Sequence, residues 1–486
     1  MPGFIEGYLL RIIWALIIGF MAASALSSSW EAEGGKTRSL MRGVSSSGRD
    51  TVIWRDPLIF PIVAVLYLGL CLFRGVKERT ILYIANVAID MFLFISIYFT
   101  LLLLLLPILR KNYTARTCAT FWLIPAFLYY RPRMLYSSSP LLPRVILYIP
   151  GKLLTLMICI WLAGFVVIFA GQVISHVHFT RKLKRYSAPV EDRMLLDRWN
   201  WMQEERGISW PIELKYCSII TTPLTVGMWK KNQITYLPEK KFSGEDSELI
   251  FSHELHHIQR KDMHTKFFLR FCNAFGWIHP FVWFAVKKAE DDLELSCDEA
   301  VLRDADSEKR KKYAELLLSV AGASSGFTTC LSASARTLRY RLKATLPGKS
   351  KRLGLDLLFW AAFIGCLSMG NLALATERGG IEEVAGLDLS QIEDAQVWRQ
   401  ESGNGTKIED MAGLSGYLEG LQIETFFTEY TEEYQDFGQW MTGDMAGSEI
   451  SFTISGDYLT VSDPEKGAER YHLRTPIDWE YIGTLY

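Results

Sequence analysis

The chain has 486 residues, enough for several domains, and its positive mean hydropathy of +0.12 is unusual for a water-soluble protein. Its net charge of −1 hides a split, because residues 377–486 hold 23 Asp and Glu against 6 Lys and Arg. The eight cysteines include no CxxC pair, which argues against a disulfide framework and against a cysteine zinc finger.

Five apolar runs, each near the ~20 residues that a bilayer needs, predict membrane spans. They are residues 12–26, 58–73, 81–109 and 153–174 within an N-terminal membrane region 1–179, and residues 357–375 later in the chain. The first run follows Arg11 and ends in small residues, so a cleaved signal peptide is its alternative interpretation. Asp90 within the third run is a functional candidate, although access to water near the end of the run explains it better.

Basic clusters at residues 181–185 and 336–352 flank the segment 180–355. The positive-inside bias therefore places this segment in the cytoplasm and residues 377–486 outside, with the N-terminus inside. Basic residues in the loop 110–144 would then lie outside, against the same bias. The predicted protein is a multi-pass α-helical membrane protein, with a mainly α (α+β) cytoplasmic domain.

Within residues 180–355 the pattern predicts a charged helix over 185–206 and strands over 212–220 and 233–237, with residues 226–229 and a turn at 230–232 between the strands. Ser243 offers N-cap chemistry for a helix that runs to about Lys261. Residues 267–286 are apolar but broken at His279-Pro280, so they form two packed helices or dip toward the membrane surface. Further helices are expected over residues 290–303 and 307–321.

The segment His253-Glu254-Leu255-His256-His257 is an HExxH pattern. His253 and His257 are four residues apart, so both imidazoles project from one helix face and suit a Zn²⁺ ion. Glu254 is rotated away from them and is the predicted general base, which takes a proton from the attacking water and gives it to the leaving amine.

A third ligand must come from elsewhere in the chain. Met263 stands where a metzincin has its third histidine, so that class is disfavoured. Glu294 in an ExxxD pattern fits a carboxylate ligand, and Asp298, one turn later, is predicted to hold a ligand histidine by a hydrogen bond. His279, as an oxyanion donor, and Asp262 are further candidates. His256, His264 and Cys297 are expected to be structural.

Three segments resemble the BlaR/MecR-type membrane metallopeptidases: HELHHIQRKD at 253–262, FGWIHPFVWF at 275–284 and ELSCDEAVL at 294–302. The resemblance implies a gluzincin-like site with His253, His257 and Glu294 as ligands and Glu254 as the general base. In such a site Asp298 forms a hydrogen bond with a ligand histidine. It also implies signalling, in which an outside event activates proteolysis of the chain itself or leads to loss of a winged-helix repressor. Direct nucleic-acid binding is not expected, and a homodimer is an open alternative.

Two departures from that family limit the resemblance. Residues 379–486 contain no SxxK motif, so sensing of β-lactams is not supported, and the run 12–26 adds a fifth span to the usual four. Residues 377–486 are instead predicted to form a small α+β extracytoplasmic domain, with strands over 449–454, 458–462 and 470–474. Their negative charge suits an unknown cationic ligand or serves only solubility.

Two other functions compete with a signalling peptidase. The first is a non-catalytic receptor with a structural metal site, for which the base Glu254 has no purpose. The second is a prenyl-protein or heat-shock type membrane quality-control zinc peptidase, which carries the same two motifs. A site-two type intramembrane protease is disfavoured because charged residues such as Glu248, Arg260 and Lys261 flank the HExxH pattern.

Overall fold

The computed structural model describes ten stretches of the chain. They are residues 2–34, 56–73, 78–128, 145–321, 335–345, 351–369, 372–399, 405–425, 438–465 and 467–486.

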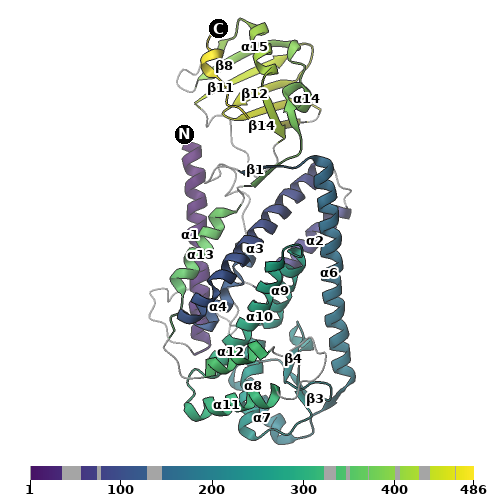
Figure 1. Ribbon diagram of the computed structural model, residues 1–486, viewed down its shortest axis with the longest axis vertical. Helices are drawn as coiled ribbons and strands as arrows, with labels where there is room; N and C mark the ends of the chain where they lie inside the picture. Colours follow the sequence, from purple (N-terminus) through teal and green to yellow (C-terminus); the bar gives the residue numbers. More distant parts are fainter. Residues whose placement is uncertain are drawn as a thin grey trace.

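Long helices occupy the middle of the molecule (Figure 1). They are α1 (Pro2–Ala32), α3 (Glu78–Asn112) and α6 (Gly151–Arg185). Among the described residues these are the three helices long and apolar enough to cross a membrane. The other two predicted spans form α2 (Ile59–Phe73), with 15 residues, and α13 (Leu355–Ser368), with 14, both shorter than the ~20 residues that a bilayer needs.

The long helices α1, α3 and α6 run in the same direction. Ala85 near the start of α3 and Leu154 near the start of α6 both pack against Leu374, at the end that holds the C-terminal sheet. The N-terminus of α1 lies at that end too (Figure 1). The predicted alternation, with the N-terminus opposite to residues 377–486, is therefore wrong. It assumed that each apolar run reverses the previous one, whereas α3 and α6 are parallel.

The apolar run 357–375 changes secondary structure partway. Helix α13 ends at Ser368, and Leu372–Ala375 forms strand β6, which pairs in parallel with β1 (Val145–Tyr148). The buried Arg11 of α1 donates to the carbonyl oxygens of Leu367 and Met369 at this helix end. A continuous helix to residue 375 was the wrong expectation, because an apolar run alone does not distinguish a helix from a buried strand.

A four-stranded sheet and several short helices occupy the end of the molecule opposite to the C-terminal sheet (Figure 1). The sheet order is β2-β3-β5-β4, with β2 (Ser187–Pro189), β3 (Glu213–Cys217), β4 (Leu224–Val226) and β5 (Ile234–Pro238). The predicted helix over 185–206 is wrong at its start. Strand β2 follows α6, and Asp192 caps a shorter helix α7 (Arg193–Glu205) with two hydrogen bonds to backbone N–H groups.

The remaining helices connect this end to the long helices. They are α4 (Ala115–Phe121), α5 (Ile124–Leu128), α8 (Gly244–Gln259), α9 (Asp262–Phe275), α10 (Pro280–Val301), α11 (Ser307–Ala321) and α12 (Ala335–Thr345). The separate helix expected over 290–303 is the second half of α10, which begins at Pro280 because proline is suited to a first helical position.

The C-terminal part is an eight-stranded sheet with the order β7-β10-β14-β13-β12-β11-β8-β9. Its strands are β7 (Arg378–Gly380), β8 (Ile392–Arg399), β9 (Gly405–Lys407), β10 (Gln422–Thr425), β11 (Gln439–Met445), β12 (Ser451–Ser455), β13 (Tyr458–Asp463) and β14 (Gly467–Leu473). Helices α14 (Ile381–Ala385), α15 (Met411–Glu419) and α16 (Trp479–Ile482) accompany it. The three predicted strands correspond to β12, β13 and β14 and are confirmed.

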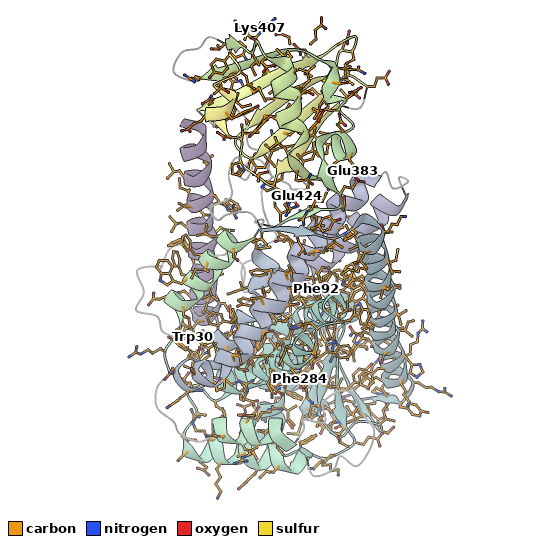
Figure 2. The ribbon with its side chains drawn as sticks, turned by 45° about the horizontal axis from the view of Figure 1, so that its top comes forward. Trp30, Phe92, Phe284, Glu383, Lys407 and Glu424 are labelled. Carbon is orange, nitrogen blue, oxygen red and sulfur yellow. The ribbon has the colours of Figure 1, made fainter. Side chains whose placement is uncertain are left out.

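Each end has its own apolar core. One core holds only residues from the C-terminal part, and another holds residues of α7, α8, α11 and the four-stranded sheet. The C-terminal part meets the rest where Glu424 of β10 lies near the β1–β6 pair (Figure 2). The site described next lies at the opposite end.

Candidate metal centre

Helix α8 carries the HExxH pattern and begins where the sequence predicts. The Ser243 hydroxyl accepts from the backbone N–H of Asp246, while the Asp246 carboxylate accepts from the N–H of Ser243. This reciprocal capping box fixes the first turn and therefore the rotation of the helix. His253 and His257 fall on one face, with their Nε2 atoms 3.1 Å apart.

Glu294 reaches the same point from α10. Its Oε2 lies 3.5 Å from Nε2 of His253 and 3.7 Å from Nε2 of His257. Ligand atoms on a tetrahedral zinc ion, at about 2.0–2.1 Å from the metal, stand roughly 3.3 Å from each other, so these separations are close to those of a zinc site. The structure thus brings together two imidazoles and a carboxylate, with no other metal-ligating side chain required.

One carboxylate oxygen of Glu294, Oε2, makes no hydrogen bond within the described residues. This oxygen is buried, and although the Arg341 guanidinium lies 3.7 Å away, it can still accept a bond from a bound cation. Burial works against ionisation, but the Lys266 ammonium, 3.3 Å from Oε1, helps to hold the pKa of Glu294 well below its usual value. The side chain is therefore a carboxylate, the form that ligates metal ions.

The other ring nitrogens are held by carboxylates. Nδ1 of His257 lies 2.6 Å from Asp262, and Nδ1 of His253 lies 3.3 Å from Asp298 and 3.1 Å from the Tyr313 hydroxyl. A carboxylate at Nδ1 fixes the ring orientation and leaves Nε2 free for a metal. Both sequence candidates, Asp262 and Asp298, thus lie directly behind a candidate ligand.

Asp298 is itself anchored by two residues that the sequence did not single out. Arg341 of α12 donates two hydrogen bonds of 2.7 Å to its carboxylate, and the Tyr313 hydroxyl of α11 donates one of 2.6 Å. Burial opposes ionisation, but the Arg341 guanidinium holds the pKa of Asp298 well below its usual range. No spacing rule links α11 and α12 to an HExxH helix, so only the fold reveals this contact.

Glu254 faces strand β4. Its Oε2 accepts a hydrogen bond of 2.8 Å from the Thr225 hydroxyl, which lies 2.9 Å from the hydroxyl of Thr235. Strand β4 is the edge of its sheet, with β5 on one side and no strand on the other among the described residues. Leu224 and Thr225 of this strand line the pocket that contains the three candidate ligands.

The pocket has an apolar wall beside its polar floor. The floor is the ligand cluster with Glu254, and the wall is formed by apolar side chains of β4, the segment after it, α8, α11 and α12: Leu224, Met228, Ile250, Leu316, Leu317 and Leu338. Pockets that combine apolar walls with a few convergent polar groups are typical binding sites.

Other sequence candidates lie elsewhere. His279 precedes α10 and does not line the pocket, and Glu294 is fifteen residues further along the chain, or about 22 Å along a helix. Asp90 is half-buried on α3, also outside the pocket. His256 is buried on another face of α8, where burial lowers its pKa well below the usual value. Cys297 is buried, with its sulfur 3.4 Å from Nδ1 of His257.

His264 lines the pocket and connects the segment before α2 with the segment after β4. Its Nδ1 lies 2.7 Å from the Asp56 carboxylate, and its Nε2 lies 2.6 Å from the carbonyl oxygen of Met228, just after β4. Both ring nitrogens face acceptors, so both carry protons. Burial works against the charge, but the hydrogen bond to Asp56 raises the pKa of His264.

A buried ion cluster ties the end of α1 to the end of α8. The Glu33 carboxylate accepts two hydrogen bonds of 2.7 Å from Arg260, the C-cap of α8, and lies near Arg116 and Arg303. Arg303 also packs over the ring of Trp30 at the lower end of α1 (Figure 2). Burial alone would raise the pKa of Glu33, but the surrounding guanidinium groups lower it.

Comparison with known proteins relates this site to one family. Residues 137–344 match the family described as BlaR1 peptidase M56. A curated relative, "Regulatory protein BlaR1" of Bacillus licheniformis, is 28% identical over 182 residues. That match covers 37% of this chain and 30% of the relative, so it relates the region of the site and not the whole of either protein.

Proposed function

Because the chain is a BlaR/MecR-type protein with an M56 metallopeptidase region, we propose that it is a membrane-bound zinc metalloendopeptidase of the gluzincin type. In this proposal an extracytoplasmic signal controls proteolysis in the cytoplasm. The observation that carries it is the convergence of His253, His257 and the Glu294 carboxylate beside a second, non-ligating carboxylate, Glu254. A purely structural metal site has no use for that second carboxylate.

The chemistry follows from the positions of these side chains. A zinc ion held by His253, His257 and Glu294 would polarise the peptide carbonyl and make water more acidic. Glu254 accepts the proton of the attacking water and returns it to the leaving amine. Thr225 holds the Glu254 carboxylate in place, and the free edge of β4 aligns an extended peptide by backbone hydrogen bonds.

The proposed orientation places the metal centre in the cytoplasm. Residues 181–185, at the end of α6 next to the four-stranded sheet, supply Arg181, Lys182, Lys184 and Arg185. The positive-inside bias favours the cytoplasmic side for such a cluster. Residues 180–355 then form the peptidase domain, while residues 377–486 and the N-terminus of α1 lie outside.

Regulation of a repressor is part of the proposal. The relative is named a regulatory protein. We infer by similarity that a cytoplasmic winged-helix repressor is the direct or indirect target, that the chain also cleaves itself, and that residues 377–486 receive an unknown extracytoplasmic ligand. Formation of a homodimer belongs to the same proposal.

The test is a single isosteric substitution. Glu254→Gln removes the base while leaving the ligands in place, so self-cleavage and cleavage of a co-expressed repressor should fall by at least ~100-fold. Glu248→Gln changes an exposed residue of the same helix and should leave both unchanged. Cleavage by the Glu254→Gln protein at the wild-type rate would favour a non-catalytic receptor, or a different base, over this proposal.

A further inference from the structure

The hairpin formed by α9 and α10 leaves the peptidase region and projects between α3 and α6 (Figure 1). We propose that its tip, residues 271–286, is immersed in the hydrocarbon of the bilayer beside α6, so that the metal centre lies at the membrane surface. The immersion rests on α6 crossing the membrane, and only its consequence for substrates rests on the proposed peptidase activity.

The tip has the composition of a membrane segment. Residues 271–286 contain no Asp, Glu, Lys or Arg, although Arg270 and Lys287 stand directly on either side. Four large side chains there are about half exposed in the protein: Ile278, Phe281, Trp283 and Phe284, at 54%, 49%, 46% and 61%. A contiguous exposed apolar surface of this kind is rare on a water-soluble domain and marks a membrane or partner surface.

The tip is attached to the middle of α6. The Trp161 indole donates to the carbonyl oxygen of Phe275, and the Trp277 indole donates to the carbonyl oxygen of Trp161. Gly164 permits this approach, because a Cβ atom there would lie 2.3 Å from the Trp277 ring. The hairpin tip is therefore level with residues 161–164 of a helix that is long and apolar enough to cross a membrane.

Several hydrogen-bond donors of the tip are paired within the protein, which lowers the cost of placing them in hydrocarbon. The Trp283 indole donates to the carbonyl oxygen of Trp277, so this exposed tryptophan presents no free N–H. In the turn, the backbone N–H groups of Gly276 and His279 are bonded to carbonyl oxygens of residues 272 and 276, and Pro280 has no N–H. These bonds remove donors that would otherwise face the exposed apolar side chains.

Lipid is the partner that we expect to cover the exposed side chains of the tip, because the surface of α6 beside them is apolar as well. Apolar residues of the hairpin and of α1, α3 and α13 belong to a single core, so the hairpin is part of the helical bundle and not of the soluble core around α8. On α6 the exposed side chains at the same level are also apolar: Leu156, Met157, Ile160, Val166 and Val167. The exposed surface of the tip thus continues the surface of a candidate span.

Helix dimensions place the metal centre at the inner membrane surface. Residues 161–164 lie 10–13 residues into α6, about 15–20 Å from its start, which is near the middle of a hydrocarbon core of about 30 Å. Glu294 lies fourteen residues beyond Pro280, at most about 20 Å back from the tip. The ion pair of Arg270 with Glu290, at 2.6 Å, lies between the tip and Glu294 along the hairpin. We therefore expect this pair to lie near the lipid headgroups.

The consequence concerns the substrate. A pocket at this depth admits peptide segments held against the membrane surface, such as the juxtamembrane parts of this chain or of an amphipathic partner. The free edge of β4 and the apolar pocket wall then face chains that approach along the bilayer and not from bulk water.

Photo-crosslinking of the full chain in vesicles of phosphatidylethanolamine and phosphatidylglycerol tests the immersion. p-Benzoylphenylalanine is placed at Phe284 or Ile278, whose exposed side chains can be replaced without disturbing the core, and mass spectrometry identifies the adducts. Leu156 on α6 is the lipid-facing control, and Met194 on α7, with 83% exposure, is the water-facing control.

We expect lipid adducts at positions 284, 278 and 156 and none at 194. Adducts between two copies of the chain at position 284, or no lipid adduct there while position 156 gives one, would overturn the proposal. Absence of lipid adducts at position 156 would overturn it as well, since α6 would not be in the bilayer. The readout needs no proteolysis, so its result is independent of the Glu254 test.

Discussion

At the scale of single residues, the candidate metal centre is held by contacts that come from distant parts of the chain. Arg341 illustrates this, because its paired hydrogen bonds fix Asp298, which in turn orients His253. Groups that orient metal ligands typically change metal affinity 10–100-fold when they are removed.

Arg341→Gln should therefore weaken zinc binding by about 10–100-fold without removing a ligand. Competition with a chromogenic chelator on the purified full-length protein measures this. Arg339→Gln, an exposed residue on the same helix, is the matched control. Equal zinc affinity in both variants would show that Asp298 orients His253 without Arg341.

The sequence located the residues that obey local spacing rules. His253, Glu254 and His257 follow from the helix repeat, and the ExxxD pattern indicated Glu294 and Asp298. Thr225, Tyr313 and Arg341 were not found, because their contacts with the site join residues that are 15 to 60 positions apart in the chain. Such pairs depend on packing between elements, for which a single sequence carries no periodic signal.

At the scale of elements, a buried ion pair joins the end of α1 to the helix that carries the HExxH pattern. Glu33 follows α1 and pairs with Arg260 at the end of α8. Both side chains are about 1% exposed, so removing one charge leaves the other buried without compensation.

Glu33→Gln should lower the free energy of unfolding by about 3–5 kcal/mol, the usual cost of breaking a buried pair. Thermal unfolding in detergent, followed by circular dichroism, measures the loss. Glu31→Gln, which changes an exposed residue of α1, should have a small effect. A similar loss in both variants would mean that the buried cluster contributes no more than a surface charge.

The contact of His264 with Asp56 and Met228 predicts a pH dependence. The pKa of His264 is raised above its unfolded value near 6.5, so its stabilising contribution is complete below that pH and is lost as the pH rises through the folded pKa. Lys261, 3.9 Å from Asp56, is the other charge beside this pair, and it lowers the pKa of His264 slightly.

His264→Gln should therefore cost about 1–3 kcal/mol at pH 6 and less in alkaline solution. Melting temperatures of the wild type and the variant across this range measure the difference. A gap between the two melting temperatures that stays constant with pH would contradict a charged His264.

Secondary structure could be predicted where capping residues or alternating polar residues accompany the apolar pattern. The capping box at Ser243 gave the start of α8, and the alternation in residues 449–474 gave β12, β13 and β14. Residues 372–375 and 187–189 were misassigned as helix. The first continues an apolar run and the second follows a long helix directly, so in both cases pairing with a distant strand decided the outcome.

At the scale of the whole molecule, parallel long helices connect the C-terminal sheet with the end that holds the candidate metal centre. Helix α6 begins beside the β1–β6 pair, close to the C-terminal sheet, and continues for 35 residues to the four-stranded sheet next to the metal centre. Helix α1, with 31 residues, runs in the same direction and is followed by the Glu33 cluster. A rigid displacement of either helix by a signal at the acidic end would reach an element that touches the site.

The topology could not be read from hydropathy alone. The positive-inside bias gives the side of each loop only when successive apolar runs alternate in direction, whereas α3 and α6 are parallel. The separation of the acidic C-terminal part from the HExxH segment, by contrast, followed from the charge split in the sequence, and the structure places them at opposite ends (Figure 1).

The central claim is that this membrane protein cuts peptide bonds with a metal held by His253, His257 and Glu294. The most direct measurement is zinc content together with proteolysis for the wild type and Glu254→Gln, purified side by side in vesicles. The account predicts a single zinc ion per chain in both proteins and cleavage by the wild type alone. Absence of zinc from both, or equal cleavage by both, would contradict it.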